Sequence, residues 1–139
     1  MRIAYLLVAD SANQSNDGKL NVLGMGVRVI NAPVLPFPVA LTVLVSAQLD
    51  HAERGAKHVK LSLATPSGSQ VLIDDTAPME SRENMIENLP LQLNFQFVLS
   101  GLAFKEAGLH HFIVEIEGER AEYPFVVQIL GTEVQSSPG

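Results

Sequence analysis

Hydrophobicity alternates with a period of two residues along Leu91-Gln92-Leu93-Asn94-Phe95-Gln96-Phe97-Val98-Leu99. Every odd-numbered position of this stretch is apolar, and three of the four even-numbered positions carry amide side chains. Because successive side chains of a strand point to opposite faces of a sheet, the pattern predicts a β-strand with one buried face. The same alternation recurs along the chain between runs of Gly, Pro, Asn and Asp, which favour turns.

Eight strands are predicted from this alternation. They cover about 2–9, 19–30, 39–49, 58–64, 70–74, 91–99, 109–117 and 122–130. Gly24 and Gly26 predict a bulge or a bend toward a sheet corner within the second strand. We expect residues 31–38, which contain three prolines, to form a connection or a poor edge strand, and residues 75–90 to form a loop with a short helix.

Eight strands with short connections favour an all-β fold, an antiparallel two-sheet β-sandwich, with a closed barrel as the alternative. In a sandwich, the apolar positions of facing strands fill one shared core. The residues expected there are Val43, Leu61, Phe95, Phe97, Phe112, Val114 and Phe125.

Composition limits the class of protein. The 139 residues are expected to form one domain over 1–131, followed by a flexible tail over 132–139. The absence of Cys excludes disulfides and zinc–thiolate sites, and it is compatible with a cytoplasmic location. The formal net charge of −6 argues against a nucleic-acid partner. The apolar run after Arg2 is short for a signal peptide, and no run is long enough to span a membrane, so we expect a first strand and no membrane partner.

Two segments carry a resemblance to known proteins. Ala9-Asp10 and the run from Asp17 to Gly24 resemble the N-terminal signature of a family of small uncharacterised bacterial proteins. Gly108–Gly118 resembles the G-x-Y-x-F-x-V-x-I-x-G closing hairpin of immunoglobulin-like sandwiches, with His110 in place of Tyr. The first resemblance implies a relationship over the whole chain and brings no activity and no catalytic residues. The second implies an immunoglobulin-like sandwich, and neither implies a function.

No residue group predicts a metal, cofactor or catalytic centre. The four histidines, His51, His58, His110 and His111, lack metal-site spacing, although His58, His111 and Glu115 are the ones that paired strands would bring closest. We interpret Asp10, Asn13, Asn16 and Asp17 as turn formers because their spacing differs from that of a calcium loop. Asp74-Asp75, Glu80, Glu83 and Glu87 are expected to be solvated acids, and Ser46, Ser62 and Ser69 lack a nucleophile motif.

A set of apolar side chains falls where polar ones are expected. These are Val98, Ile113, Val126 and Leu130, which would form one exposed patch if the strands over 91–99, 109–117 and 122–130 shared a sheet. Only 17% of the residues are charged and 47% are hydrophobic, which also favours surface buried against another chain. A second copy in a homodimer is one possible cover for the patch, and the loop over 75–90 is the other.

These features favour a non-catalytic binding or assembly module with a protein partner, itself or another chain. The alternative is a structural subunit of a phage or secretion-type assembly, and an enzyme without a recognisable motif ranks third.

Overall fold

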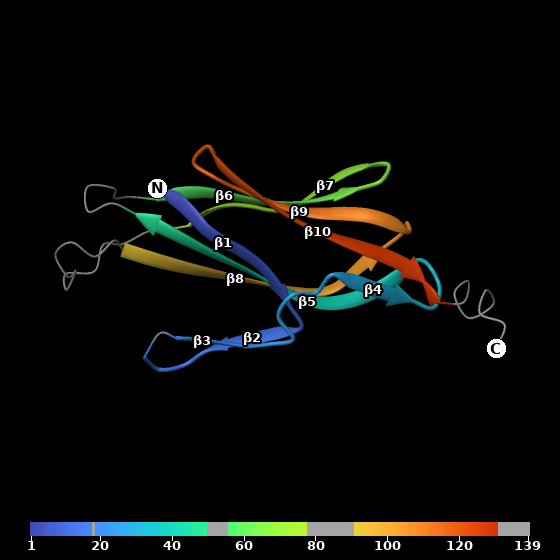
Figure 1. The fold of residues 1–139 in the computed structure, drawn as a ribbon. Coiled ribbons are helices and arrows are strands. Elements are labelled where there is room, and N and C mark those ends of the chain that lie inside the picture. Colours follow the sequence, from blue (N-terminus) through green and yellow to red (C-terminus); the bar gives the residue numbers. More distant parts are fainter. Residues whose placement is uncertain (18, 50–55, 78–90, 131–139) are drawn as a thin grey trace.

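The computed structural model describes residues 1–17, 19–49, 56–77 and 91–130, which form ten strands in three sheets (Figure 1). One main sheet has the order β1-β5-β8 and the other has the order β4-β10-β9-β6-β7, while β2 and β3 form a separate hairpin. The strands are β1 (Arg2–Ala9), β2 (Ser11–Gln14), β3 (Leu20–Leu23), β4 (Val29–Ala32), β5 (Phe37–Leu49), β6 (Lys57–Thr65), β7 (Gly68–Ala77), β8 (Leu91–Phe104), β9 (Gly108–Ile116) and β10 (Glu119–Ile129).

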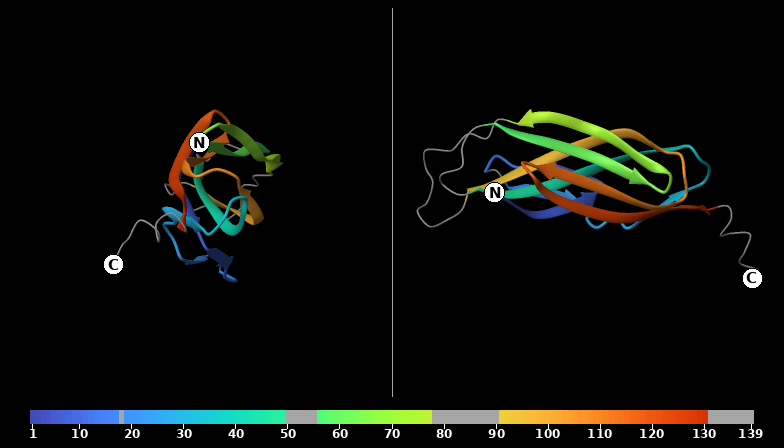
Figure 2. Two further views of the ribbon diagram at one scale, coloured as in Figure 1. Left: turned by 90° about the vertical axis from the view of Figure 1, so that its right-hand side faces the viewer. Right: turned by 90° about the horizontal axis from the view of Figure 1, so that it is seen from above.

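The two main sheets pack face to face as a β-sandwich, with β1 lying near β10 (Figures 1 and 2). Alternate residues of each strand enter the core between the sheets, as the period of two residues predicts. Of the expected core residues, Val43, Leu61, Phe112, Val114 and Phe125 are at most 2% exposed. The all-β sandwich is therefore confirmed, with ten strands in place of eight.

Two of the expected core residues, Phe95 and Phe97, are only half-buried. Both point toward the core, and their rings stack with centroids 6.3 Å apart. They lie on β8, which is the outermost strand of its sheet, so the facing sheet covers them incompletely. The prediction that they are fully buried was wrong, because alternation identifies the inner face of a strand but not its place in the sheet.

The strand expected over 19–30 is two short strands that lie in different places. Residues 20–23 pair with β2, whereas 29–32 pair with β10 and form an edge of the five-stranded sheet. The chain changes direction at Gly24 and Gly26, which have positive φ angles. The bend was anticipated, but the strand pairing was not. β4 runs parallel to β10, so the expectation of purely antiparallel sheets was also wrong at this edge.

The β2–β3 hairpin lies over the outer face of the three-stranded sheet (Figure 1). Ala12, Leu20 and Val22 are half-buried, whereas Asn13 and Asn21 on the opposite face are exposed and joined by a side-chain hydrogen bond of 2.9 Å. The Gln96 side chain of β8 donates a hydrogen bond of 2.7 Å to the carbonyl oxygen of Ala12.

This hairpin covers part of the outer face of β5, and the side chains of Tyr5 on β1 and Asn94 on β8, joined by a hydrogen bond of 3.4 Å, flank Ser46 on the same strand. The outward residues of β5, Thr42, Leu44 and Ser46, are at most 3% exposed. Alternation places these residues on the face opposite Val43, but the pattern does not indicate which segment covers that face.

In its described part, the structure contains no helix with the length and hydropathy of a membrane span.

Replacing Gly24 with alanine is expected to lower the free energy of unfolding by about 1–3 kcal/mol. A Cβ at this position would lie 2.1 Å from Oδ2 of Asp10, and φ is +67°. Gly26→Ala is the matched control, since φ is +89° there but no atom lies within 4 Å of the added Cβ. Denaturant unfolding of both variants separates the steric contact from the backbone strain. Equal losses would show that Asp10 moves aside freely.

Candidate functional site

The apolar residues expected to form one patch lie on two different sheets. Val98 is 64% exposed on the outer face of β8, in the three-stranded sheet. Ile113 on β9 and Val126 on β10 point outward from the five-stranded sheet, and Leu130 follows β10 directly. The assumption that these strands share a sheet was wrong, because the chain crosses from one sheet to the other between β8 and β9. The structure therefore separates Val98 from the other three residues.

A row of exposed apolar residues crosses the outer face of the five-stranded sheet. Val126 pairs with Leu109 on β9 and with Val29 on β4, and the three residues are 37%, 53% and 48% exposed respectively. We call these three residues the outer apolar row. Leu109 and Val29 were missed from sequence. Leu109 was detectable because it shares its face of β9 with Ile113, whereas Val29 required knowledge of the strand pairing.

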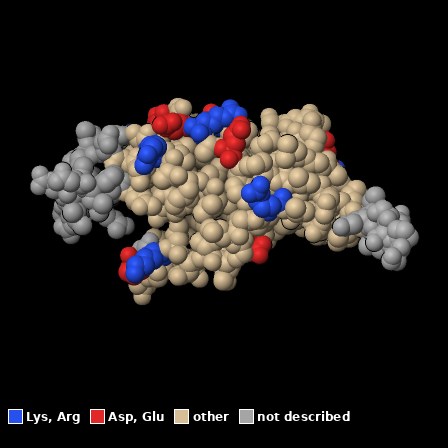
Figure 3. Space-filling model, in the orientation of Figure 1, with Lys and Arg blue, Asp and Glu red and all other residues tan. Residues whose placement is uncertain are grey.

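Charged side chains occupy the other end of the same outer face. Strand pairing places Asp74, Lys60, Glu115 and Arg120 side by side across four strands, so that the signs of charge alternate. Nη2 of Arg120 donates a hydrogen bond of 2.7 Å to Oε1 of Glu122, and this bond holds the pKa of Glu122 below its ordinary value. In Figure 3, several acidic and basic side chains lie together along the top of the molecule, and fewer are scattered over the broad uncharged surface below. The charged end is thus neutralised locally, whereas the outer apolar row is exposed as far as the described residues go.

The edge of β8 differs from the other sheet edges. Among the described residues, this 14-residue strand pairs only with β5, through 12 residue pairs interrupted by a bulge between Leu99 and Leu102, and it contains no charged residue and no proline. Natural proteins protect exposed sheet edges with charge, proline, short strands or covering segments, because an open edge can pair with another chain.

Each of the other edges has such protection. The β7 edge carries Asp74 and Asp75, and β4 has only four residues. The carbonyl oxygen of Val8 on β1 accepts hydrogen bonds from the backbone N–H groups of Gly26 and Val27 at 2.9 and 3.2 Å. Within the described part of the chain, the β8 edge is therefore the one best suited to pairing with a further strand.

The inner face beside this edge has apolar surface still to bury. Leu93, Phe95, Phe97 and Leu99 point toward the core and are half-buried. A strand added beside β8 would place its own side chains against these residues. The edge therefore offers both backbone hydrogen bonds and apolar contact.

The described histidines do not converge. His111 lies opposite Ala64, which is six residues from His58 along β6, a span of roughly 20 Å at strand rise. The His58 ring instead contacts the Asp74 carboxylate, and its backbone N–H donates to Oε1 of Glu117 at 2.9 Å. Within the described residues, no three His, Cys, Asp or Glu side chains are grouped as metal ligands would be. His51 lies outside the described residues.

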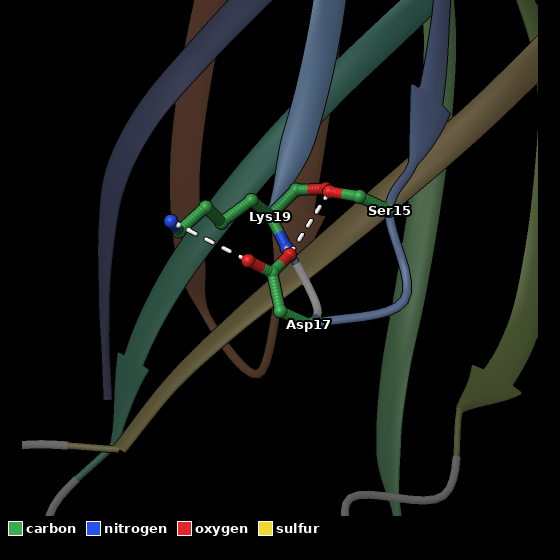
Figure 4. A network of polar contacts seen from close by, with 3 residues as sticks. All are labelled: Ser15, Asp17 and Lys19. Atoms are coloured by element: carbon green, nitrogen blue, oxygen red, sulfur yellow. Dashed lines mark hydrogen bonds and ion pairs between the residues drawn. The ribbon is translucent and has the colours of Figure 1, made fainter.

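The Asp/Asn-rich segment near the N-terminus forms part of the β2–β3 hairpin. Oδ1 of Asp17 accepts hydrogen bonds from the Lys19 backbone N–H at 3.3 Å and from the Ser15 hydroxyl at 3.0 Å (Figure 4). These bonds, the backbone one foremost, lower the pKa of Asp17 from its ordinary value. Asn13 belongs to β2 and Asp10 lies beside Gly24, so the oxygens serve the turn and its flanks.

The acidic and serine residues considered as catalytic groups do not lie together in the described part of the chain. Asp74 and Asp75 lie on β7, whereas Glu80, Glu83 and Glu87 lie outside the described residues. Of the segment 75–90 that was expected to form a loop, residues 75–77 belong to β7 instead, and 78–90 lie outside the described residues. Ser46 is buried on β5, where its Oγ accepts a hydrogen bond of 2.7 Å from the Gln92 amide. Ser62 is buried on β6, and Ser69 lies on β7.

Comparison with known proteins assigns the chain to a family. Residues 4–128 match the model of a family of unknown function, DUF6941. The chain belongs to this family. The match includes every strand of the sandwich, so the DUF6941 domain and the described fold coincide apart from the ends. The resemblance to an uncharacterised family is thereby confirmed.

No curated protein matches the chain. Among solved structures, it is similar to the β-glucosidase from Listeria innocua in complex with gluconolactone, with a TM-score of 0.45 and 15% sequence identity. The similarity covers 88% of this chain and 16% of that protein.

Proposed function

We propose that this chain is a non-catalytic assembly module that associates with a second copy of itself through the β8 edge. The observation that carries the proposal is the 14-residue edge without charge or proline, whose inner apolar side chains are half-buried. Addition of a strand to an open edge is a common mode of protein recognition, because backbone hydrogen bonds supply affinity and alternate side chains supply specificity.

The residues of β8 suit pairing with an identical strand. About a two-fold axis at Phe95, antiparallel pairing sets Leu93 against Phe97 of the second copy and Asn94 against its Gln96. Gln92 then faces Val98, so apolar residues meet on the inner face and mainly amides meet on the outer one. A single self-complementary strand is enough for such a dimer, since a two-fold contact uses the same surface on both subunits.

Sedimentation equilibrium and cysteine cross-linking test this proposal together. The chain has no native Cys, so Gln92→Cys/Val98→Cys introduces the only two thiols. Within one chain these positions are six residues apart on an extended strand, but in the dimer they face each other at about 4.5–5.5 Å between Cα atoms, within disulfide range.

We expect the double variant to form a covalent dimer on mild oxidation and each single variant to remain uncross-linked. A wild-type chain that stays monomeric at high micromolar concentration would refute self-association. A dimer that fails to cross-link would refute the β8 edge as its contact.

A second candidate is a structural subunit of a phage or secretion-type assembly, and the outer apolar row favours it. Val29, Leu109 and Val126 lie on the outer face of the opposite sheet from β8. Two separate contact surfaces, each two-fold, generate an open chain of subunits rather than a closed dimer. Electron microscopy distinguishes the candidates: filaments that disappear in Val126→Lys would favour the subunit, and discrete dimers in both proteins would favour the module.

The proposal extends to the cellular compartment, the kind of partner and the fold relationship. The absence of Cys supports a reducing compartment such as the bacterial cytoplasm, and the acidic balance supports a protein partner rather than a nucleic acid or a membrane surface. The β9–β10 hairpin, which spans the G-x-Y-x-F-like segment, supports an immunoglobulin-like relationship.

A further inference from the structure

A pocket of about 220 Å³ lies at one end of the sandwich, between the β6–β7 turn and the connection from β8 to β9. The Ser67 hydroxyl in the turn donates a hydrogen bond of 2.6 Å to Oε2 of Glu106 in the connection. Gly108 packs closely on the same turn, since an added Cβ would lie 3.1 Å from Cγ of Pro66. The two walls are thus fixed to each other by a polar and a steric contact.

A buried histidine lines this pocket. His110 is 1% exposed, stacks on Phe125 with ring centroids 5.5 Å apart, and meets the edge of Phe104 at the same distance. Its Nδ1 lies 2.9 Å from the carbonyl oxygen of Gly108, an acceptor, so Nδ1 carries the hydrogen. In the neutral ring, Nε2 is then an acceptor, and among the described residues it has no hydrogen-bond partner.

One wall of the pocket carries a negative charge. Hydrogen bonds to the Glu106 carboxylate, foremost from the Ser67 hydroxyl and also from the Thr65 side chain and the Ser67 backbone, lower the pKa of Glu106 from its ordinary value, so its carboxylate is ionised at neutral pH. A carboxylate offers about four acceptor positions, so that of Glu106 can accept a further hydrogen bond. Lys105 also lines the pocket, but it is exposed and is not among the groups that shift the pKa of Glu106.

The Thr65 hydroxyl, on the wall formed by the β6–β7 turn, already takes part in hydrogen bonds within that turn. Oγ1 of Thr65 accepts a hydrogen bond from the Gly68 backbone N–H at 3.1 Å and lies 3.2 Å from the Gly68 carbonyl oxygen. Leu63 and Phe104 add buried apolar surface, whereas the donors of Ser69, Gln70 and Lys105 belong to exposed residues. The less exposed polar groups left to bind a ligand are therefore the Glu106 carboxylate and the His110 ring, and the carboxylate is anionic.

We propose that this pocket binds the head group of a small organic cation that carries N–H donors, a guanidinium or a primary ammonium. The Glu106 carboxylate and Nε2 of His110 would accept its hydrogen bonds, while Phe104 and Leu63 exclude water from one side. The volume is below the roughly 300–1,000 Å³ of sites for drug-sized ligands, so the pocket fits a head group rather than a whole large molecule. This site is independent of the β8 edge and of self-association.

Methylguanidine and N-methylurea are suitable probes, because they have similar planar shapes and only the first is charged. We expect methylguanidine to cause saturable NMR shifts at the His110 ring and at the Gly68 and Gly108 amides, and N-methylurea to cause none. Equal responses to the two probes, or no saturable response at high millimolar concentration, would overturn the proposal.

Glu106→Gln removes the charge and retains an acceptor for Ser67. We expect it to weaken methylguanidine binding by about tenfold to a hundredfold, the range for loss of a charged hydrogen bond. Glu119→Gln is the matched control, since Glu119 is an exposed carboxylate at the start of β10, outside the pocket. Unchanged affinity in Glu106→Gln, with a native spectrum, would equally overturn the assignment.

Discussion

Replacing Phe112 with alanine is expected to lower the free energy of unfolding by about 3–5 kcal/mol, the usual cost of deleting a core phenylalanine. Phe112 is fully buried on β9, and its ring stacks on Phe125 with centroids 5.0 Å apart. β9 is the middle strand of the five-stranded sheet, so strands on both sides hold the backbone and limit collapse of the cavity.

Phe97→Ala is the matched comparison, because the same side chain is half-buried on the edge strand β8. We expect a loss of about 1–2 kcal/mol, in proportion to the smaller buried area. Denaturant unfolding at a concentration that populates only the monomer measures both. A loss below about 1 kcal/mol for Phe112→Ala would contradict its place in the core.

Two double variants that differ only in the sign of the charge at position 92 are expected to dimerise through the proposed β8 contact with different affinities. In the register about Phe95, position 92 faces position 98 of the second copy. Gln92→Lys/Val98→Lys therefore sets like charges together twice, whereas Gln92→Glu/Val98→Lys sets opposite charges together twice. Cross-strand charge pairs contribute roughly 0.2–1 kcal/mol each, so we expect the dimer dissociation constants of the two variants to differ by about tenfold or more.

Two features of these variants exclude other causes for a difference between their dissociation constants. Both variants lose the hydrogen bond from Gln92 to Ser46, so its loss cancels. The Lys/Lys variant also has the smaller net charge, −6 + 2 = −4 against −6 − 1 + 1 = −6, so general repulsion would act in the opposite direction. Sedimentation equilibrium gives both constants. Equal constants would show that residues 92 and 98 do not face each other.

β8 shows which features of the proposed contact could be predicted from the sequence. The alternation around Phe95 predicted a strand and its inner face correctly, and it singled out Val98 as an outward apolar residue. It did not reveal that β8 ends its sheet, and the edge is the feature on which the proposed function rests. Strand order depends on which segments meet across the core, and side-chain alternation has the same period at an edge as at the centre.

The pocket was even harder to predict from the sequence than the β8 edge. Ser67, Glu106 and His110 are separated in sequence, and no spacing between them resembles a known motif. They meet because the β6–β7 turn and the β8–β9 connection end at the same end of the sandwich. Alternation places His110 on the same face of β9 as the core residues Phe112 and Val114, and the structure adds that it lies where the core reaches the pocket.

Local alternation and turn residues were enough to establish an all-β sandwich and the buried faces of β5, β6, β9 and β10, because each depends on the pattern of neighbouring residues in the chain. Tertiary structure alone decided the division of 19–30 between two sheets, the parallel pairing of β4 with β10, and the cover that the β2–β3 hairpin provides for β5. Each of these joins segments whose own patterns fit several partners equally well. The choice among those partners follows from the packing of the whole chain, which buries the most apolar surface only in one arrangement.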